Sequence, residues 1–573
     1  MDFQAPKWRV HLIYLIIFTI LACFTLSYSF KHHKNQDWVF WKAENFADQG
    51  GYFIYNPIWF DYGYKSANFP IASDTLLGHG FSLASPIIKD KYTCGVAYLQ
   101  APFYLWMKID AKLNHRSMKI NGTQTKRAID VAGVFYMLLG AICLYFFLVR
   151  FFLPFISFTS ICLVIVGTNV LYYGVFHPGM SHIYSFFLYS VSLLLADSFF
   201  QKKKKWMLIL LSLTAACIIL IRPINIFFLP CIFFIRGSVK DNLLFFFKPI
   251  HLLIMVGVTA MVFAPQMYYW YLISGKLIYY SYTEEGFTHL KDPAVIRVLF
   301  APENGLIPYS IIYILLLIAN IYAIIKKQRF AIYYFVYQLI AFYLIASWHA
   351  PAFGASYGQR NFVEIFAGLV FPFAFLLTKL STLKIKIGVA TTLLLALVMC
   401  FYNLKIMSRY DYAFFGRSPW DWREYKYFVS FANYTQKENF NHYYKPEYIT
   451  KQGRNSILNI NPEQEYSRLL LFDCNQLPDY IKKETISMDI KSDEENLDFF
   501  TCIEIVNADT TLLKDLFHTQ CNKPHKNKWE HVKLSYSVKK INSFDLSKSK
   551  MLVFIWNKNR QKFVIDNVKI RIN

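Results

Sequence analysis

The residues best suited to chemistry lie in polar stretches between long apolar segments. Asp48 begins the run Asp48-Gln-Gly-Gly-Tyr52, which follows the first apolar segment and is surrounded by aromatic residues. A carboxylate that aromatic rings partly desolvate can act as a general base, and Tyr52 is a candidate for substrate contact beside it. The alternative is a solvated loop carboxylate, since most loop acids are of that kind. The same stretch holds the rival acids Asp37, Asp61 and Asp74.

Two histidines enclose a second polar stretch, His177-Pro-Gly-Met-Ser-His182. They are five residues apart, which is not the i, i+4 spacing of a helical zinc pair. We expect them to hydrogen-bond a substrate or a phosphate, with a helix-capping or interfacial role as the alternative.

Two arginines complete the set of candidates. Arg222 precedes Pro223 inside an apolar stretch. A charge there usually lines a cavity or meets an anion, unless the side chain snorkels to the surface. Arg360 precedes another apolar stretch, and its guanidinium suits bidentate phosphate binding. An ion pair with Glu364, one helical turn on, is the alternative for Arg360. An acid, histidines and two arginines together suggest an anionic, lipid-linked substrate.

Several classes of site are absent from the sequence. It has no P-loop, GxSxG, HExxH or GxGxxG run in the required context, so soluble-nucleotide chemistry is unsupported. It has no CxxC and no Cys/His pair at zinc-ligand spacing. We therefore expect no cofactor, and the sequence gives a divalent metal no support.

The elements that must position these residues are membrane helices. Of the 573 residues, 55% are hydrophobic, which is too apolar for an ordinary soluble enzyme of this length. The net charge of +23 sits largely in short runs between apolar segments, where it sets topology, so nucleic acid is not an expected partner. We expect about eleven spanning segments, as a crossing helix needs roughly 20 apolar residues. They lie near 10–28, 131–149, 151–173, 183–199, 206–221, 224–235, 250–273, 306–325, 331–347, 362–377 and 387–402.

The basic runs predict the orientation of these segments. With a cytoplasmic N-terminus, one topology places every Lys/Arg cluster inside and the C-terminal part outside. It requires 206–235 to form a tight hairpin with its apex at Arg222-Pro223, where proline breaks the helix. The first outer loop then spans 31–130, and all candidate site residues lie on the outer face. Within that loop, 96–107 reads as an interfacial helix.

The C-terminal part differs in composition from the rest. We predict a membrane domain over 1–403, a linker over 404–454 and a soluble outer β-sandwich over 455–573. Short β-type runs occur at 467–472, 485–490, 499–506, 531–538, 551–556 and 563–572.

The chain resembles the GT-C superfamily of membrane glycosyltransferases, most closely the bacterial branch related to protein O-mannosyltransferases and lipid A aminoarabinose transferase. The resemblance covers about 10–402. It rests on Asp48 ahead of Gly51-Tyr52, on the basic-Pro apex at Arg222-Pro223, and on Gly354-x-x-x-Gly-Gln-Arg360 before a late helix. The run Phe300-Ala-Pro-Glu-Asn-Gly-Leu-Ile-Pro-Tyr309 is similar to one in Bacteroidetes-type members. The tail resembles carbohydrate-binding jelly-roll modules in architecture only.

This resemblance implies a polyprenyl-phosphate-linked sugar donor, with a glycan, lipid or protein as acceptor. It implies that Asp48 is the catalytic base of an inverting transfer and that Arg222 or Arg360 stabilises the leaving phosphate. Several members carry two adjacent acids, whereas Gln49 follows Asp48 here, which speaks against a metal. The implied location is the inner membrane of a bacterium, with the tail in the periplasm.

Two other functions are alternatives, and the sequence favours each of them less. A transporter or flippase of lipid-linked sugars would favour inverted repeats and charges near mid-bilayer, and no repeat stands out. A glycan-binding protein that the membrane part only anchors needs a single span.

Overall fold

The computed structural model describes 7–36, 43–282, 285–354, 356–382, 386–410, the single residues Trp422, Tyr425 and Val429, and most of 458–572 in the β-strands and their turns. The chain divides into two compact units, one made of 1–34 and 40–429 and the other of 35–39 and 430–573. The first is helical and the second is built of strands. Most of the predicted linker, 404–454, lies outside the described residues, but its first residues continue a helix to Arg409.

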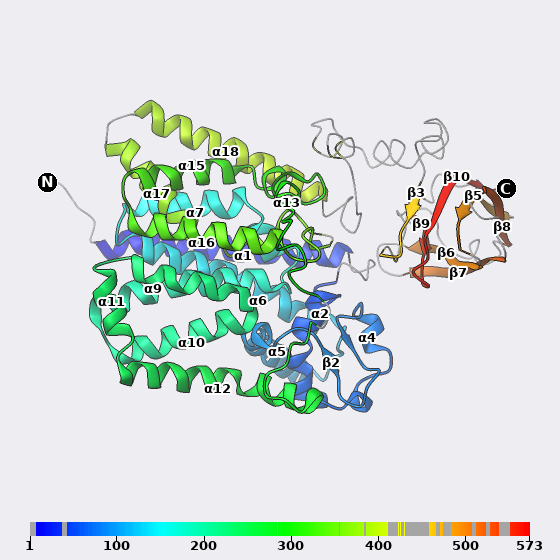
Figure 1. The fold of residues 1–573 in the computed structure, drawn as a ribbon, viewed down its shortest axis with the longest axis horizontal. Coiled ribbons are helices and arrows are strands. Elements are labelled where there is room, and N and C mark those ends of the chain that lie inside the picture. Colours follow the sequence, from blue (N-terminus) through cyan, green and yellow to red (C-terminus); the bar gives the residue numbers. More distant parts are fainter. Residues whose placement is uncertain are drawn as a thin grey trace. The chain divides into compact units, whose positions relative to one another are not determined.

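Each apolar segment expected from the sequence contains a helix, and the long helices run side by side in the first unit (Figure 1). They are α1 (Lys7–Gln36), α6 (Thr123–Leu148), α7 (Pro154–Gly167), α9 (Ser181–Lys202), α10 (Lys205–Ile221), η4 (Pro223–Phe234), α12 (Pro249–Ser274), α15 (Ile312–Ile325), α16 (Arg329–Ala346), α17 (Phe366–Thr382) and α18 (Lys386–Arg409).

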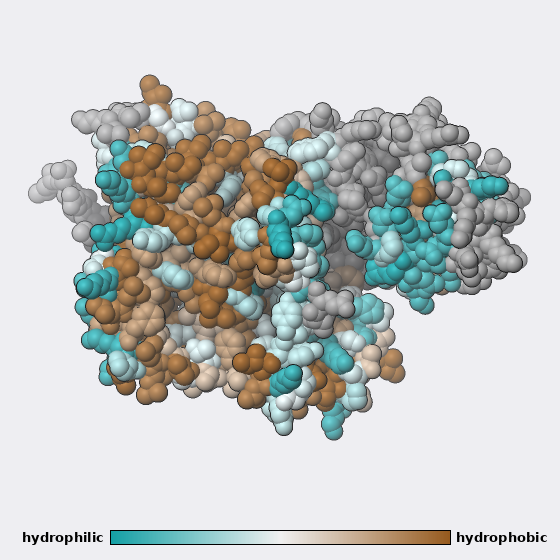
Figure 2. Space-filling view, viewed as in Figure 1, coloured by the Kyte–Doolittle hydropathy of each residue, from teal (hydrophilic) through white to brown (hydrophobic). Residues whose placement is uncertain are grey.

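Six of these helices are long and apolar enough to cross a membrane: α1, α6, α9, α12, α16 and α18. Four others, α7, α10, α15 and α17, are apolar but shorter, and η4 forms a pair with α11 (Val239–Phe246) that is bent by 119°. Figure 2 shows apolar residues gathered over the helical unit between hydrophilic rims at its two ends. The unit therefore has the surface of a multi-pass membrane protein, while the count of about eleven crossings stays a prediction.

The break at Arg222 has the predicted cause. Helix α10 ends at Ile221, Arg222 is extended (φ −150°, ψ 109°), and Pro223 opens the 3-10 helix η4. Proline cannot continue the α10 hydrogen-bond ladder, and η4 then packs against α10. The chain turns back at this point and leaves Arg222 at the tip of the turn.

The first polar loop folds into short elements that gather at one end of the helices, together with α5 (Figure 1). They are α2 (Asp48–Phe53), α3 (Tyr55–Pro57), η2 (Ile58–Tyr62), η3 (Ser66–Asn68), α4 (Ser73–Leu76), β1 (Phe81–Ser82) and β2 (Lys89–Asp90). Helix α5 runs over Gly95–Leu113 and is longer than the interfacial helix expected over 96–107. The same end holds α13 (Val295–Phe300). The remaining short helices that the structure describes are α8 (Val170–Val175), α14 (Leu306–Tyr309) and η5 (Arg360–Phe362).

Glycine lets the first turn of α2 pack closely. A Cβ at Gly51 would lie 2.7 Å from the carbonyl oxygen of Gly80 and would clash with the ring of Tyr92. The Gly-Gly pair that follows Asp48 therefore allows Tyr92 to approach α2. This contact brings a second loop residue to Asp48.

The second unit contains two four-stranded antiparallel sheets, ordered β3-β10-β5-β8 and β4-β9-β6-β7. The strands are β3 (Leu458–Ile460), β4 (Leu470–Asp473), β5 (Lys483–Ser492), β6 (Asn496–Val506), β7 (Thr511–Asn522), β8 (Glu530–Ser537), β9 (Lys550–Trp556) and β10 (Phe563–Ile572). The buried rings of Phe499 and Phe563 join the sheets with centroids 5.0 Å apart. The predicted strands are thus present, β3 and β7 were not predicted, and the jelly-roll topology stays a prediction.

Candidate active site

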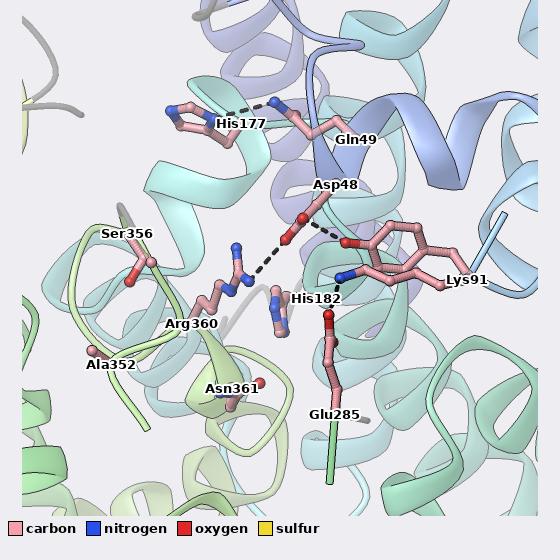
Figure 3. Close-up of polar contacts among 12 residues, drawn as sticks. Asp48, Gln49, Lys91, His177, His182, Glu285, Ala352, Ser356, Arg360 and Asn361 are labelled. Atoms are coloured by element: carbon pink, nitrogen blue, oxygen red, sulfur yellow. Dashed lines mark hydrogen bonds and ion pairs between the residues drawn. The ribbon is translucent and has the colours of Figure 1, made fainter. Parts of the chain in front are cut away.

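Asp48 and Arg360 form an ion pair at the end of the helical unit where the first loop gathers (Figure 3). The Arg360 Nη2 donates to Asp48 Oδ2 at 2.8 Å, and the Tyr92 hydroxyl donates to Asp48 Oδ1 at 2.5 Å. The Asp48 side chain remains 32% exposed. A carboxylate has about four acceptor positions, so Asp48 can still take a hydrogen bond from a substrate hydroxyl.

The charges around Asp48 keep it ionised. Burial is the largest single influence and opposes ionisation, but Arg360, Tyr92 and Lys91 together outweigh it and lower the pKa of Asp48 below its usual value. Burial likewise opposes the charge on Arg360, but Asp48 and the neighbouring tyrosines together outweigh burial and raise the pKa of that guanidinium. Both groups are therefore charged at neutral pH.

A second polar cluster surrounds Arg222. Its Nη1 donates to Glu364 Oε1 at 2.7 Å and lies 2.7 Å from His182 Nδ1, while its Nη2 donates to the side-chain oxygen of Asn361. Asn361 follows Arg360 in the chain, so η5 carries one residue of each cluster. Glu364 pairs with Arg222, and the alternative pairing of Glu364 with Arg360, suggested by their spacing, is wrong because Arg360 turns to Asp48.

We predict that Arg222 is needed for stability as well as for substrate. Glu364 is 2% exposed, and Arg222→Met leaves the Glu364 carboxylate without its guanidinium partner. Breaking a buried ion pair in this way lowers the free energy of unfolding by about 3–5 kcal/mol. The double variant Arg222→Met/Glu364→Met removes both charges and should recover part of that loss. Thermal unfolding in detergent measures both, and equal melting temperatures for the two variants would contradict this role.

The Arg222 cluster contains an unsatisfied donor. Asn361 is 3% exposed, and its Nδ2 has no hydrogen-bond acceptor among the residues that the structure describes. The first turn of α9, which bears His182, adjoins the same cluster, and its N-cap, Met180, provides no side-chain hydrogen bond. A helix N-terminus with a nearby unused amide donor and two guanidinium groups is suited to an anion.

Tyr52 and His177 lie beside these clusters. The ring of Tyr52 is 4.3 Å from that of Tyr92, and burial, followed by the charge of Asp48, raises the pKa of Tyr52, which keeps it neutral. His177 Nδ1 lies 3.4 Å from Gln49 Nε2 (Figure 3). The His177 ring also stacks on the ring of Tyr172. The structure thus places Tyr52 and Arg360 near the carboxylate of Asp48. It places His182 and Arg222 around Glu364, and His177 beside Gln49.

Sequence reasoning missed Tyr92 and the ion pair of Lys91 with Glu285. Lys91 Nζ lies 2.7 Å from Glu285 Oε1, and the Ser281 hydroxyl donates to the Lys91 carbonyl at 2.6 Å. These bonds join the first loop to the segment after α12, close to Asp48. The sequence does show a polar run, Asp90-Lys91-Tyr92, in the same loop, but no spacing in the sequence connects this run to Asp48.

The surroundings of Asp48 do not fit a divalent metal. Its two oxygens face a guanidinium and a phenol, and Lys91 adds a further positive charge. A metal would need more carboxylate, imidazole or thiolate ligands in place of these cations.

No family model and no curated protein matches the chain. Solved structures of the oligosaccharyltransferase of Archaeoglobus fulgidus are similar to it. AglB in complex with an inhibitory peptide and a dolichol-phosphate is 13% identical with a TM-score of 0.38, over 75% of this chain and 61% of that one. The apo form gives 11% and 0.36, over 74% and 59%.

The complex of the same enzyme with Zn and sulfate gives 13% identity and a TM-score of 0.31, over 60% of this chain and 49% of that one. The chain therefore spans less than two thirds of the length of the proteins it matches. At these TM-scores the likeness decides neither a shared fold nor a shared activity.

Proposed function

We propose that this chain is a membrane glycosyltransferase that transfers a sugar from a polyprenyl-phosphate carrier to an acceptor hydroxyl on the extracytoplasmic face. The observation that carries the proposal is the pairing of Asp48 with Arg360 at one end of an apolar helical unit. Asp48 is partly exposed and is held ionised beside a guanidinium group, so a base and an anion-binding group lie next to each other. The resemblance of the same residues to GT-C motifs supplies the substrate class.

In this reaction Asp48 accepts the proton of the acceptor hydroxyl. The acceptor oxygen then forms a bond to the anomeric carbon from the side opposite the carrier, which inverts its configuration. The bond between that carbon and the phosphate oxygen breaks, and its electron pair leaves with the polyprenyl phosphate. Phosphate is a fair leaving group, so positioning and charge stabilisation supply much of the catalysis.

Arg360 links the base to the leaving group. One guanidinium has five N–H donors, and the pair with Asp48 uses only its Nη2. Its other donors can reach a phosphate oxygen while Asp48 stays ionised. Arg222, the free amide donor of Asn361 and the start of α9 extend the same anion site.

The remaining candidates take supporting roles in this proposal. Tyr52 contacts the sugar or the acceptor from the buried side of Asp48, and His182 orients Arg222. His177 holds Gln49, the residue after Asp48, and so positions the base. The helical unit lies in the inner membrane of a bacterium, and the β-stranded unit lies in the periplasm, where it binds carbohydrate.

Purified protein in liposomes tests the proposal against transport. The probe is a fluorescent polyprenyl-phosphate sugar, supplied in both leaflets together with a mixture of sugar, lipid and peptide hydroxyl acceptors. We expect a new glycoside and free polyprenyl phosphate. Movement of the intact lipid between leaflets with no new glycosidic bond would indicate a flippase and overturn the proposal.

A further inference from the structure

Three ionisable side chains meet inside the helical unit, apart from the pair at Asp48. His33 comes from the end of α1, Glu44 from the start of the first loop, and Asp130 from the first turns of α6. All three are buried, with 6%, 3% and 2% exposed. Their ligand atoms lie within 4.8 Å of one another.

The distances bring one imidazole nitrogen against two carboxylates. His33 Nδ1 lies 2.7 Å from Asp130 Oδ1 and 3.6 Å from Glu44 Oε1. Ser29 adds a hydroxyl that donates to Asp130 Oδ1 at 3.2 Å. Two carboxylates face a single imidazole here. The charge of Lys126 also acts on Glu44, more weakly than the charges of His33 and Asp130 do. Two buried carboxylates are costly unless a cation neutralises them, and either a protonated His33 or a bound metal ion can supply that charge.

The other nitrogen of His33 is already fixed. Its Nε2 lies 3.2 Å from the carbonyl oxygen of Phe176, and with the proton on Nε2 this is a donated hydrogen bond. The lone pair of Nδ1 then points to the two carboxylates. Histidines that bind metals characteristically donate their second ring N–H to a carbonyl or a carboxylate in this way.

We propose that His33, Glu44 and Asp130 bind a divalent first-row cation, for which Zn²⁺ is the best match. One imidazole and two carboxylates form a ligand set that zinc accepts. Ligand atoms around zinc at about 2.0–2.2 Å are separated by roughly 3.3–3.6 Å. The His33–Glu44 separation of 3.6 Å already fits, and Asp130 needs to move outward by less than about 1 Å.

The cation connects three separate segments beneath the first loop. Glu44 lies four residues before Asp48, and the carbonyl of its neighbour Ala43 accepts a hydrogen bond from Gln49 Nε2 at 3.4 Å. The metal therefore fixes the start of the loop that carries Asp48 and takes no part in bond making. This inference does not depend on the proposed transfer reaction.

The test measures metal on the full-length protein, purified in detergent without a polyhistidine tag. After chelation, incubation with ZnCl₂ and gel filtration, we expect about one equivalent of zinc per chain by elemental analysis. Co²⁺ in its place should give visible d–d absorption. Asp130→Asn and Glu44→Gln should each weaken zinc binding more than about tenfold.

The matched control is His11→Gln, on the same helix α1, where His11 contacts the Tyr145 hydroxyl instead. It should retain the metal. Wild-type protein that retains less than about a tenth of an equivalent would overturn the proposal, and so would Asp130→Asn or Glu44→Gln variants that bind zinc like the wild type. The wild-type result decides the matter even where a variant does not fold.

Discussion

Asp48→Asn should lower the rate of sugar transfer by about 10²–10⁴-fold, the usual contribution of a general base. Asparagine keeps the size of the side chain and can still accept from Tyr92, but it cannot take the proton of the acceptor hydroxyl. The rate of glycoside formation by purified protein at saturating donor measures the effect.

Asp61→Asn is the matched control, since Asp61 is another first-loop acid but pairs with Lys108 at 2.5 Å. That variant should keep wild-type activity. Thermal unfolding of Asp48→Asn separates a catalytic loss from misfolding. Near-normal transfer by a folded Asp48→Asn protein would exclude Asp48 as the base.

Arg360→Gln should reduce transfer by about 10²–10³-fold, because it removes a charged donor to the leaving phosphate. It should also move the acid limb of the pH–rate profile to higher pH. Asp48 acts only when ionised, and Arg360 is the group that lowers its pKa against the effect of burial. Without Arg360 the pKa rises, so activity is lost earlier as the pH falls.

Arg360→Lys gives a graded comparison, because lysine keeps the charge but not the forked set of donors. It should hold the acid limb close to that of the wild type while losing rate. Arg297→Gln is the control for loss of an ion-paired arginine, since Arg297 pairs with Glu303 outside the site. An Arg360→Gln profile with an unmoved acid limb would show that Arg360 does not act on the base.

Hydropathy predicted the helices because an apolar segment in lipid must satisfy its backbone hydrogen bonds internally. The turn at Arg222-Pro223 was predictable for a local reason, since proline lacks the N–H that a continuing helix needs. Strand β7 was missed because Thr511–Asn522 mixes charged and polar residues with no clear alternation, and its pairing with β6 supplies what the local sequence lacks.

The sequence singled out candidate site residues but could not predict how they pair. Asp48 and Arg360 are 312 positions apart, and only the tertiary fold brings them together. Their spacing in the sequence suggested an ion pair between Arg360 and Glu364, whereas in the structure Glu364 forms an ion pair with Arg222. Tyr92 reaches Asp48 because Gly51 leaves room for its ring, which no local pattern reveals.

The fate of the carrier lipid tests most directly whether the protein transfers a sugar with Asp48 as the base. Purified wild-type protein is mixed with a polyprenyl-phosphate sugar and acceptor, without any nucleotide sugar, and mass spectrometry follows both products. We expect equal amounts of free polyprenyl phosphate and of a glycoside with inverted anomeric configuration, both formed about 10²–10⁴-fold more slowly by Asp48→Asn. A retained configuration, or carrier release that Asp48→Asn leaves unchanged, would contradict the assignment of Asp48 as the base of an inverting transfer.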